Sequence, residues 1–217
     1  MSLYPILLNL KEKEVLVIGL GKVGTRKTMG LLNTGCKLTV MGKNQEKLNM
    51  ALSERKSRKS NLIENILPFI DFRKNDFEIG KDEDILRGKT LIFVCTSDKD
   101  LNEYIALKAK DLGILCLRAD EGMDSDFINP SVIEKEKLII SISSSGNSPA
   151  YSRLVKEMLE DIVSGLDTDS IELMGRAREK IKKMNIKDNE KRELLKRLPF
   201  MNKEELKSYE DNCGNKG

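Results

Sequence analysis

Three glycines with a fixed spacing, Gly19, Gly21 and Gly24, stand near the start of the chain in the pattern Gly-x-Gly-x-x-Gly. They follow a short apolar run and precede a helical pattern, so they join a predicted strand to a predicted helix. In such a turn the first glycine allows a tight bend, the second lets a phosphate approach the backbone, and the third lets helix and strand pack closely. The N–H groups at the start of the helix then attract the phosphates. The pattern predicts a dinucleotide site, and a purely structural turn is the alternative.

An acid is missing from its expected place after the second predicted strand. Sites specific for NAD usually carry Asp or Glu about 20 residues beyond the glycines, where it binds the ribose hydroxyls. Here the strand runs into Lys43 and Asn44, and the first acid is Glu46. We therefore expect backbone groups, or Lys43 and Asn44, to hold the ribose. Lys43 would also tolerate a 2′-phosphate, so these residues leave NAD and NADP open.

Small polar residues follow another apolar run, Thr90–Cys95. Thr96, Ser97 and Asp98 fit a loop that lies against the nicotinamide half of a dinucleotide. The alternative is that Ser97 or Asp98 caps the helix expected from Leu101. The two roles are compatible with each other.

Asp120 and a hydroxyl-rich loop are two further candidates. The chain has no histidine, so a proton transfer must use a carboxylate, lysine, tyrosine or cysteine. Asp120 follows a predicted strand, where it could accept a proton or orient a substrate nitrogen, unless it is an ordinary loop carboxylate. The loop Ser141–Pro149 leads into a helix with Ser148 as its cap, and is either an anion site or a flexible turn.

The composition is that of a globular chain with an uneven charge. Of 217 residues, 39% are hydrophobic and 34% charged, and the apolar runs are too short to cross a bilayer. The opening residues lack a signal-peptide pattern, so we expect a cytoplasmic protein. The four cysteines form no CxxC pair, so we expect free thiols and no metal site. Residues 176–217 hold 13 Lys or Arg against 8 Asp or Glu, which suits an anionic partner or a solvated surface. The low aromatic content argues against nucleic acid.

Strands and helices alternate through the first half, which predicts an α/β fold with a parallel sheet. The predicted strands are Glu14–Ile18, Lys37–Met41, Thr90–Cys95, Ile114–Leu117 and one or two short ones within 61–72. The predicted helices are Lys22–Asn33, Gln45–Arg58 and Leu101–Leu112.

The pattern changes after Asp120, where two strands, Ser131–Glu134 and Leu138–Ser143, precede a helix that runs from Pro149 to about Ser164. From Thr168 onward the chain is helical, with breaks near 185–188 and at Pro199. We therefore divide the chain into a Rossmann-like domain (1–119), a middle α+β segment (120–165) and a small helical domain (166–217).

In this order, the pieces resemble the dehydrogenase module of siroheme synthase, a family known as precorrin-2 dehydrogenase and, in some members, as sirohydrochlorin ferrochelatase. The similar segments are the opening Tyr4–Leu10, which looks like the family's first short strand, the glycine turn with Thr25–Lys27, Thr96–Asp98 with Leu101 and Asn102, Phe127–Ser131, Ile140–Pro149 and the tail Gly175–Leu198. The segment that ends at Pro149 is the most specific of these.

The resemblance implies that precorrin-2, a tetrapyrrole with eight carboxylates, gives a hydride to NAD⁺ and loses a proton, forming sirohydrochlorin. It puts Asp120 on the family's essential aspartate and Ser144 on a serine of the substrate cleft. It implies a homodimer formed through about 123–164, and it lets basic residues such as Arg153 and Lys156 attract the macrocycle. The positions that match NAD-contacting residues are Lys22, Val23, Lys43 and Asn44.

The chain also departs from the family's pattern. The family usually has Asn-Val-Val before its aspartate, where this chain has Leu117, Arg118 and Ala119. Arg118 could therefore meet a substrate carboxylate or point to solvent. Glycine is common where Ser145 stands. Metal insertion, with Asp120 accepting the protons, is a second activity to test, and an NAD-sensing regulatory module is the alternative of another class.

Overall fold

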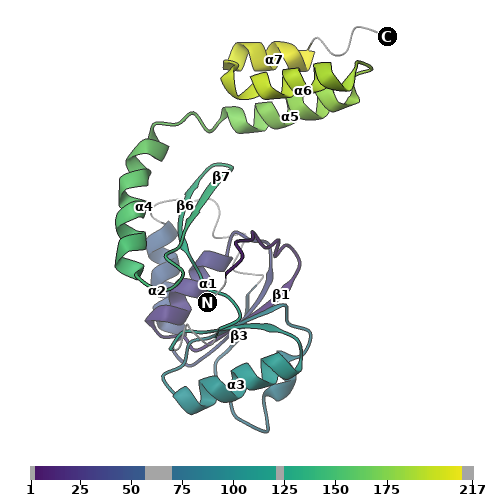
Figure 1. Ribbon diagram of the computed structural model, residues 1–217. Coiled ribbons are helices and arrows are strands. Elements are labelled where there is room, and N and C mark those ends of the chain that lie inside the picture. Colours follow the sequence, from purple (N-terminus) through teal and green to yellow (C-terminus); the bar gives the residue numbers. More distant parts are fainter. Residues whose placement is uncertain (1–2, 57–69, 121–124, 212–217) are drawn as a thin grey trace. The chain divides into compact units, whose positions relative to one another are not determined.

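The computed structural model describes residues 3–56, 70–120 and 125–211, and it divides into two compact units, Met1–Asn129 and Pro130–Gly217. In the first unit, five parallel strands form one sheet in the order β3-β2-β1-β4-β5. Figure 1 shows this unit in the colours from purple to teal. The strand order reverses between β1 and β4, and ligands of such sheets bind at the carboxyl ends of the strands beside this reversal. The strands are β1 (Glu14–Ile18), β2 (Lys37–Met41), β3 (Ile70–Arg73), β4 (Leu91–Val94) and β5 (Leu115–Arg118).

Residues of β1 alternate between two hydrophobic cores, one on each face of the sheet. Val15 and Val17 belong to the first core, and Leu16 and Ile18 to the second. All four are almost completely buried, because helices cover both faces and a parallel strand can then be apolar throughout. The helices of this unit are α1 (Lys22–Leu31), α2 (Gln45–Lys56), the short 3₁₀ helix η2 (Glu83–Leu86) and α3 (Lys99–Asp111).

The predicted α/β class is confirmed, and β1 and β2 have the predicted bounds. The predicted strands within 61–72 are represented by β3, while residues 61–69 and the helix end at 57–58 lie outside the described residues. The 3₁₀ helix η2 was not predicted from the sequence. It buries Leu86 in the second core.

The short strand expected at Tyr4–Leu10 is wrong. The described residues 3–10 have no regular secondary structure and pair with no strand of either sheet. A strand requires hydrogen bonds to a neighbouring backbone, and apolar residues alone do not supply them. Tyr4, Ile6 and Leu7 are instead exposed.

The second unit begins with an antiparallel hairpin of β6 (Ser131–Lys135) and β7 (Leu138–Ile142), which is followed by α4 (Pro149–Ser164). The predicted cap is confirmed, since the Ser148 hydroxyl accepts a hydrogen bond from the Tyr151 N–H at 3.2 Å. At the other end of α4, the Lys135 ammonium donates to the carbonyls of Val163, Ser164 and Leu166 at 3.2, 2.8 and 2.6 Å. A cation at this end of a helix interacts favourably with the helix dipole.

The described part of the tail forms three α-helices and one 3₁₀ turn around a small core of its own. Ala177, Ile181, Leu198 and Leu206 are buried together. No helix among the described stretches is long and apolar enough to cross a membrane. The helices are α5 (Ser170–Lys183), α6 (Asp188–Arg197), the 3₁₀ turn η4 (Leu198–Phe200) and α7 (Lys203–Asp211), so the breaks predicted near 185–188 and at Pro199 are both present.

The first unit extends ten residues beyond the predicted end of the Rossmann-like domain at 119. Phe127 packs edge-to-face on Phe93 of β4, with 5.5 Å between the ring centroids. The Asp126 carboxylate accepts a hydrogen bond from the Cys116 N–H at 2.9 Å. These contacts attach residues 125–129 to the sheet, and the three-part division of the chain stays a prediction.

Candidate dinucleotide and proton-transfer site

The glycine turn follows β1 and packs against the ends of β2 and β4. Gly19 has φ +95°, and its N–H donates to the Met41 carbonyl at the end of β2 at 2.8 Å. A Cβ atom on Gly19 would lie 2.6 Å from both the carbonyl carbon and the oxygen of Cys95, which follows β4. Both the left-handed backbone and the lack of space therefore require glycine here.

Gly24 and Gly21 meet opposite conditions. A Cβ on Gly24 would stand 1.8 Å from the Gly19 carbonyl oxygen, a distance that no packing tolerates, whereas a Cβ on Gly21 would meet nothing within 4 Å. Gly21 is the N-cap of α1, and its carbonyl accepts the helix's first backbone bond, from Thr25 at 3.0 Å. The preceding N–H groups, on Lys22, Val23 and Gly24, have no partner within the helix. Open space beside these donors, with no acidic residue in the first turn, fits a pyrophosphate.

Cys95 lies directly beneath this turn. Burial raises the pKa of its thiol to about 11, against the opposing influence of Lys27 and Arg26 on α1. Burial also lowers the pKa of Lys27, whose ammonium lies 5.9 Å from the centre of the Phe93 ring. Cys95 is therefore a neutral packing residue at neutral pH.

The second strand leads to an ion pair that the sequence did not reveal. The Lys43 ammonium lies 2.6 Å from a carboxylate oxygen of Asp76, which arrives from the segment after β3. The hydrogen bond from Lys43 to Asp76 raises the pKa of Lys43, and Glu78 adds a smaller effect of the same sign. Lys43 and Asn44 are both exposed at the end of β2, as predicted for ribose contacts. Asp76 was missed because it stands 33 residues beyond Lys43.

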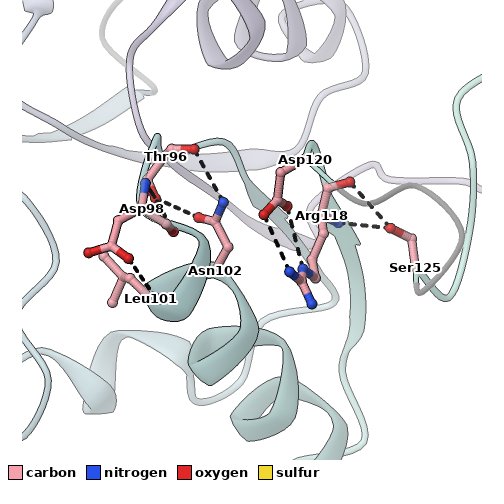
Figure 2. Close-up of polar contacts among 7 residues, drawn as sticks. All are labelled: Thr96, Asp98, Leu101, Asn102, Arg118, Asp120 and Ser125. Atoms are coloured by element: carbon pink, nitrogen blue, oxygen red, sulfur yellow. Dashed lines mark hydrogen bonds and ion pairs between the residues drawn. The ribbon is translucent and has the colours of Figure 1, made fainter.

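The loop after β4 caps α3 and fixes a buried amide (Figure 2). Asp98 is the N-cap, because its carboxylate accepts a hydrogen bond from the Leu101 N–H at 3.0 Å. The Thr96 hydroxyl donates to the side-chain oxygen of Asn102 at 2.5 Å, and the Asn102 amide donates to the Thr96 carbonyl at 3.2 Å. Ser97 is exposed. The capping role of Asp98 is thus present, and the nicotinamide contacts of Thr96, Ser97 and Asp98 stay predictions.

Asp120 and Arg118 form a close pair at the end of β5 (Figure 2). The Arg118 Nη2 lies 3.3 Å from Asp120 Oδ2, and Nε lies 3.4 Å from Oδ1. Asp120 is exposed through its backbone, but its side chain exposes only 14%, and that of Arg118 only 7%. The expectation that Arg118 points to solvent is therefore wrong. Its alternative, a contact with a substrate carboxylate, would have to share the guanidinium with Asp120.

The neighbours of Asp120 favour the ionised form of its carboxyl group. Burial alone would raise the pKa of its carboxyl group, but hydrogen bonds from Arg118 and Asn102, and the charge of Arg118, together lower it. Asp120 is thus a carboxylate at neutral pH. It lies at the same edge of the sheet as the glycine turn, because Ala119 donates to the Val94 carbonyl at the end of β4 at 2.9 Å.

Ser144 lies in the second unit, within a hydrogen-bonded turn before α4. Its hydroxyl donates to the Ser148 carbonyl and accepts from the Ser148 N–H, both at 2.9 Å, and it receives the Ser152 hydroxyl at 3.1 Å. Ser145 has φ +55°, a left-handed backbone that explains why glycine is common at this position. Ser144 shapes the turn, and its contact with substrate stays a prediction.

Comparison with known proteins agrees with this geometry. Residues 6–131 match the family described as Putative NAD(P)-binding. The chain is 32% identical over 185 residues to siroheme synthase of Buchnera aphidicola subsp. Acyrthosiphon pisum (strain APS), covering 84% of this chain and 35% of that protein. It is 28% identical over 184 residues to siroheme synthase 2 of Aeromonas salmonicida (strain A449), covering 85% and 35%. The chain thus spans about a third of the length of these curated relatives.

A solved structure shares the fold along the whole chain. The protein titled "SirC, precorrin-2 dehydrogenase" superposes with a TM-score of 0.69 and 21% sequence identity, and the match covers 99% of this chain and 100% of that one. At this identity the likeness establishes the fold: a parallel α/β unit followed by a hairpin and helices.

Proposed function

We propose that this chain, which belongs to the family described as Putative NAD(P)-binding, oxidises precorrin-2 to sirohydrochlorin with NAD⁺ as the hydride acceptor. The observation that carries the proposal is a carboxylate, Asp120, held at the sheet edge that also presents the glycine turn. The siroheme synthase relatives and the solved precorrin-2 dehydrogenase support the choice of substrate.

In this proposal, different residues bind the cofactor and accept the proton. The N–H groups of Lys22, Val23 and Gly24 bind the pyrophosphate. Bound NAD⁺ supplies the oxidising power by accepting the hydride. Asp120, already ionised, either accepts the proton that leaves the macrocycle or orients the ring that loses it. A contact of Ser144, in the second unit, with the substrate is a separate part of the proposal, and it rests on the resemblance to the family.

The acids near Lys43 favour NAD over NADP. Asp76 contacts Lys43 and Glu78 acts on it, so the cation at the end of β2 already has a counter-charge. A 2′-phosphate would have to displace Asp76 and lie beside these carboxylates, and like charges repel. The Asp76 carboxylate can instead accept hydrogen bonds from ribose hydroxyls, as the acid missing from the usual position would.

The proposed reaction predicts NADH formation, followed by its absorbance at about 340 nm, when purified protein is mixed with NAD⁺ and precorrin-2. We expect slower reduction of NADP⁺, because of the carboxylates near Lys43. Absence of turnover with authentic precorrin-2 would refute the proposed function. Parallel reactions with sirohydrochlorin and Fe²⁺ or Co²⁺, with and without protein, decide whether the chain also accelerates metal insertion.

An apolar stripe along α4 supports a homodimer formed through the middle segment. Tyr151, Leu154, Met158 and Ile162 recur at helical spacing, and each exposes between 51% and 64%. Such a stripe is normally covered, since it leaves a continuous apolar surface in water. We propose that a second copy of this chain covers it.

Met158→Lys is expected to convert the dimer to a monomer, because it puts a charge at the centre of the stripe. Light scattering after size-exclusion chromatography measures the mass. Glu157→Lys, at an exposed neighbouring position off the stripe, is the control and should remain dimeric. A wild-type chain that is monomeric at micromolar concentration would contradict the dimer proposal.

A cytoplasmic location is also part of the proposal. The three cysteines within the described stretches, Cys36, Cys95 and Cys116, are free thiols. Reduced thiols are typical of the cytoplasm, where glutathione and thioredoxin keep them so.

A further inference from the structure

Arg118 is a buried cation with a fixed backbone. It ends β5 and pairs with Val94 of β4 in the sheet. Its N–H donates to the Ser125 hydroxyl at 2.9 Å, and that hydroxyl lies 3.4 Å from the Arg118 carbonyl oxygen. With the main chain held on both sides and the side chain 7% exposed, the guanidinium has little freedom to move away from Asp120. Figure 2 shows the two side chains facing each other.

The side chains that act on the Asp120 carboxyl come from β5 and α3, and the charge of Asp120 in turn acts on Cys95. Arg118 comes from β5, and Asn102 from α3 contributes a neutral amide. Cys95 follows β4, and its thiol stays protonated because its pKa is about 11. Arg26 and Lys27, on α1, act on Cys95. Among the described groups named as acting on the Asp120 carboxyl, Arg118 is thus the one that carries a charge at neutral pH.

The contact between Arg118 and Asp120 is bidentate. Nε approaches one carboxylate oxygen and Nη2 the other, at 3.4 and 3.3 Å. A planar guanidinium that reaches both oxygens fixes the rotation of the carboxyl plane as well as its position, which a lysine ammonium cannot do. Asn102 also lowers the pKa of Asp120, and the Asn102 side chain is itself held by hydrogen bonds with Thr96.

We propose that Arg118 is a positioning residue, which locks the Asp120 carboxylate in one orientation for the reaction at this site. The inference rests on the proposed function for what Asp120 does, and on the pair's geometry for how it is held. Arg118 acts through Asp120, so its loss should weaken catalysis more than cofactor binding.

The direction of the pH effect follows from the pair. Arg118 lowers the pKa of Asp120, so the carboxylate persists to a lower pH than an ordinary aspartate would allow. Removing Arg118 leaves burial as the main influence, which raises this pKa. The acidic limb of the rate profile should then move to higher pH, since protonated Asp120 cannot accept a proton.

Three variants test the inference: Arg118→Val, which removes the cation, Arg118→Lys, which keeps the charge without the fork, and Arg118→Gln, which keeps a neutral donor. Carbon NMR of protein labelled at the aspartate carboxyls follows the titration of Asp120 directly, with Asp120→Asn assigning the signal. We expect the Asp120 titration in Arg118→Val to move upward by about 1–3 pH units. Arg118→Lys should restore most of that shift but not the rate, because a single ammonium does not fix the carboxyl plane.

Kinetics provide the second readout. We expect kcat of Arg118→Val to fall about 10–100-fold, an order typical of a misplaced catalytic group, with the affinity for NAD unchanged. Arg87→Val, which removes an exposed arginine paired with Asp84 at 3.2 Å, is the matched control and should behave as wild type. If Arg118→Val does not fold, Arg118→Gln gives the same comparison.

Opposite results would overturn the inference. An Asp120 titration that is the same in wild type, Arg118→Val and Arg118→Gln would show that the pair does not hold the carboxylate. An unchanged kcat in all three variants would show that positioning does not matter. A wild-type protein without precorrin-2 turnover refutes the proposed function instead, and the NMR titration still decides whether Arg118 holds Asp120.

Discussion

Replacing Asp120 by asparagine is expected to lower the rate of precorrin-2 oxidation by about 10²–10⁴-fold, the usual contribution of a positioned acid or base. Asparagine has nearly the same shape and can still contact Arg118, but it accepts no proton. The affinity for NAD should stay within about twofold of the wild-type value, because the substitution does not change the N–H groups that bind the phosphates. Initial rates of NADH formation and calorimetric titration with NAD⁺ measure the two quantities separately.

The control for this substitution is Asp111→Asn, at the exposed end of α3, which should keep the wild-type rate. Full activity of Asp120→Asn would exclude a proton-transfer role for this carboxylate. The same pair of measurements separates the enzyme from the alternative class: a wild-type chain that binds NAD and turns over nothing would be an NAD-sensing module.

Gly24→Ala is expected to abolish measurable NAD binding and to destabilise the first unit. The added methyl group would stand 1.8 Å from the Gly19 carbonyl oxygen, so α1 must move away from the turn. Overpacking of this kind costs about 1–3 kcal/mol or more in the free energy of unfolding. The shift would also misalign the three N–H groups at the start of α1. Thermal unfolding and NAD titration measure the two effects.

Two other glycines of the same region separate an effect on NAD binding from an effect on stability. Gly30→Ala, on α1 with nothing within 4 Å, should bind NAD as wild type does and gain about 0.5–1 kcal/mol of stability, since alanine suits a helix interior better. Gly21→Ala also has open space and should fold normally, but its methyl group would occupy the phosphate position. NAD binding by Gly24→Ala at wild-type affinity would contradict the assigned turn geometry.

Much of the fold was predictable because its signals are local. A parallel strand buried on both faces is largely apolar, so the bounds of β1 and β2 could be predicted from the sequence. A serine before a proline marks the start of α4, because both act through their own backbone. The glycine turn was predictable because its spacing is recognisable within six residues, although the lack of space at Gly19 comes from Cys95, which follows β4.

The remaining features depend on which segments the fold brings together. Asp76 meets Lys43 because β3 pairs with β2, a neighbour relation that no spacing encodes. Arg118 faces Asp120 because the chain bends after β5 and Ser125 holds the strand end. The opening Tyr4–Leu10 resembles the family's first short strand, but it pairs with no strand among the described residues.

The burial of the Cys95 thiol beneath the glycine turn affects how readily this sulphur is oxidised. With its pKa at about 11, roughly one Cys95 in ten thousand is a thiolate at neutral pH, and the thiolate is the form that peroxide and alkylating agents attack. The dinucleotide turn therefore rests on a sulphur with little tendency to oxidise. Exposed cysteines of low pKa are the ones that oxidise readily, and the buried thiol under this turn does not belong to that class.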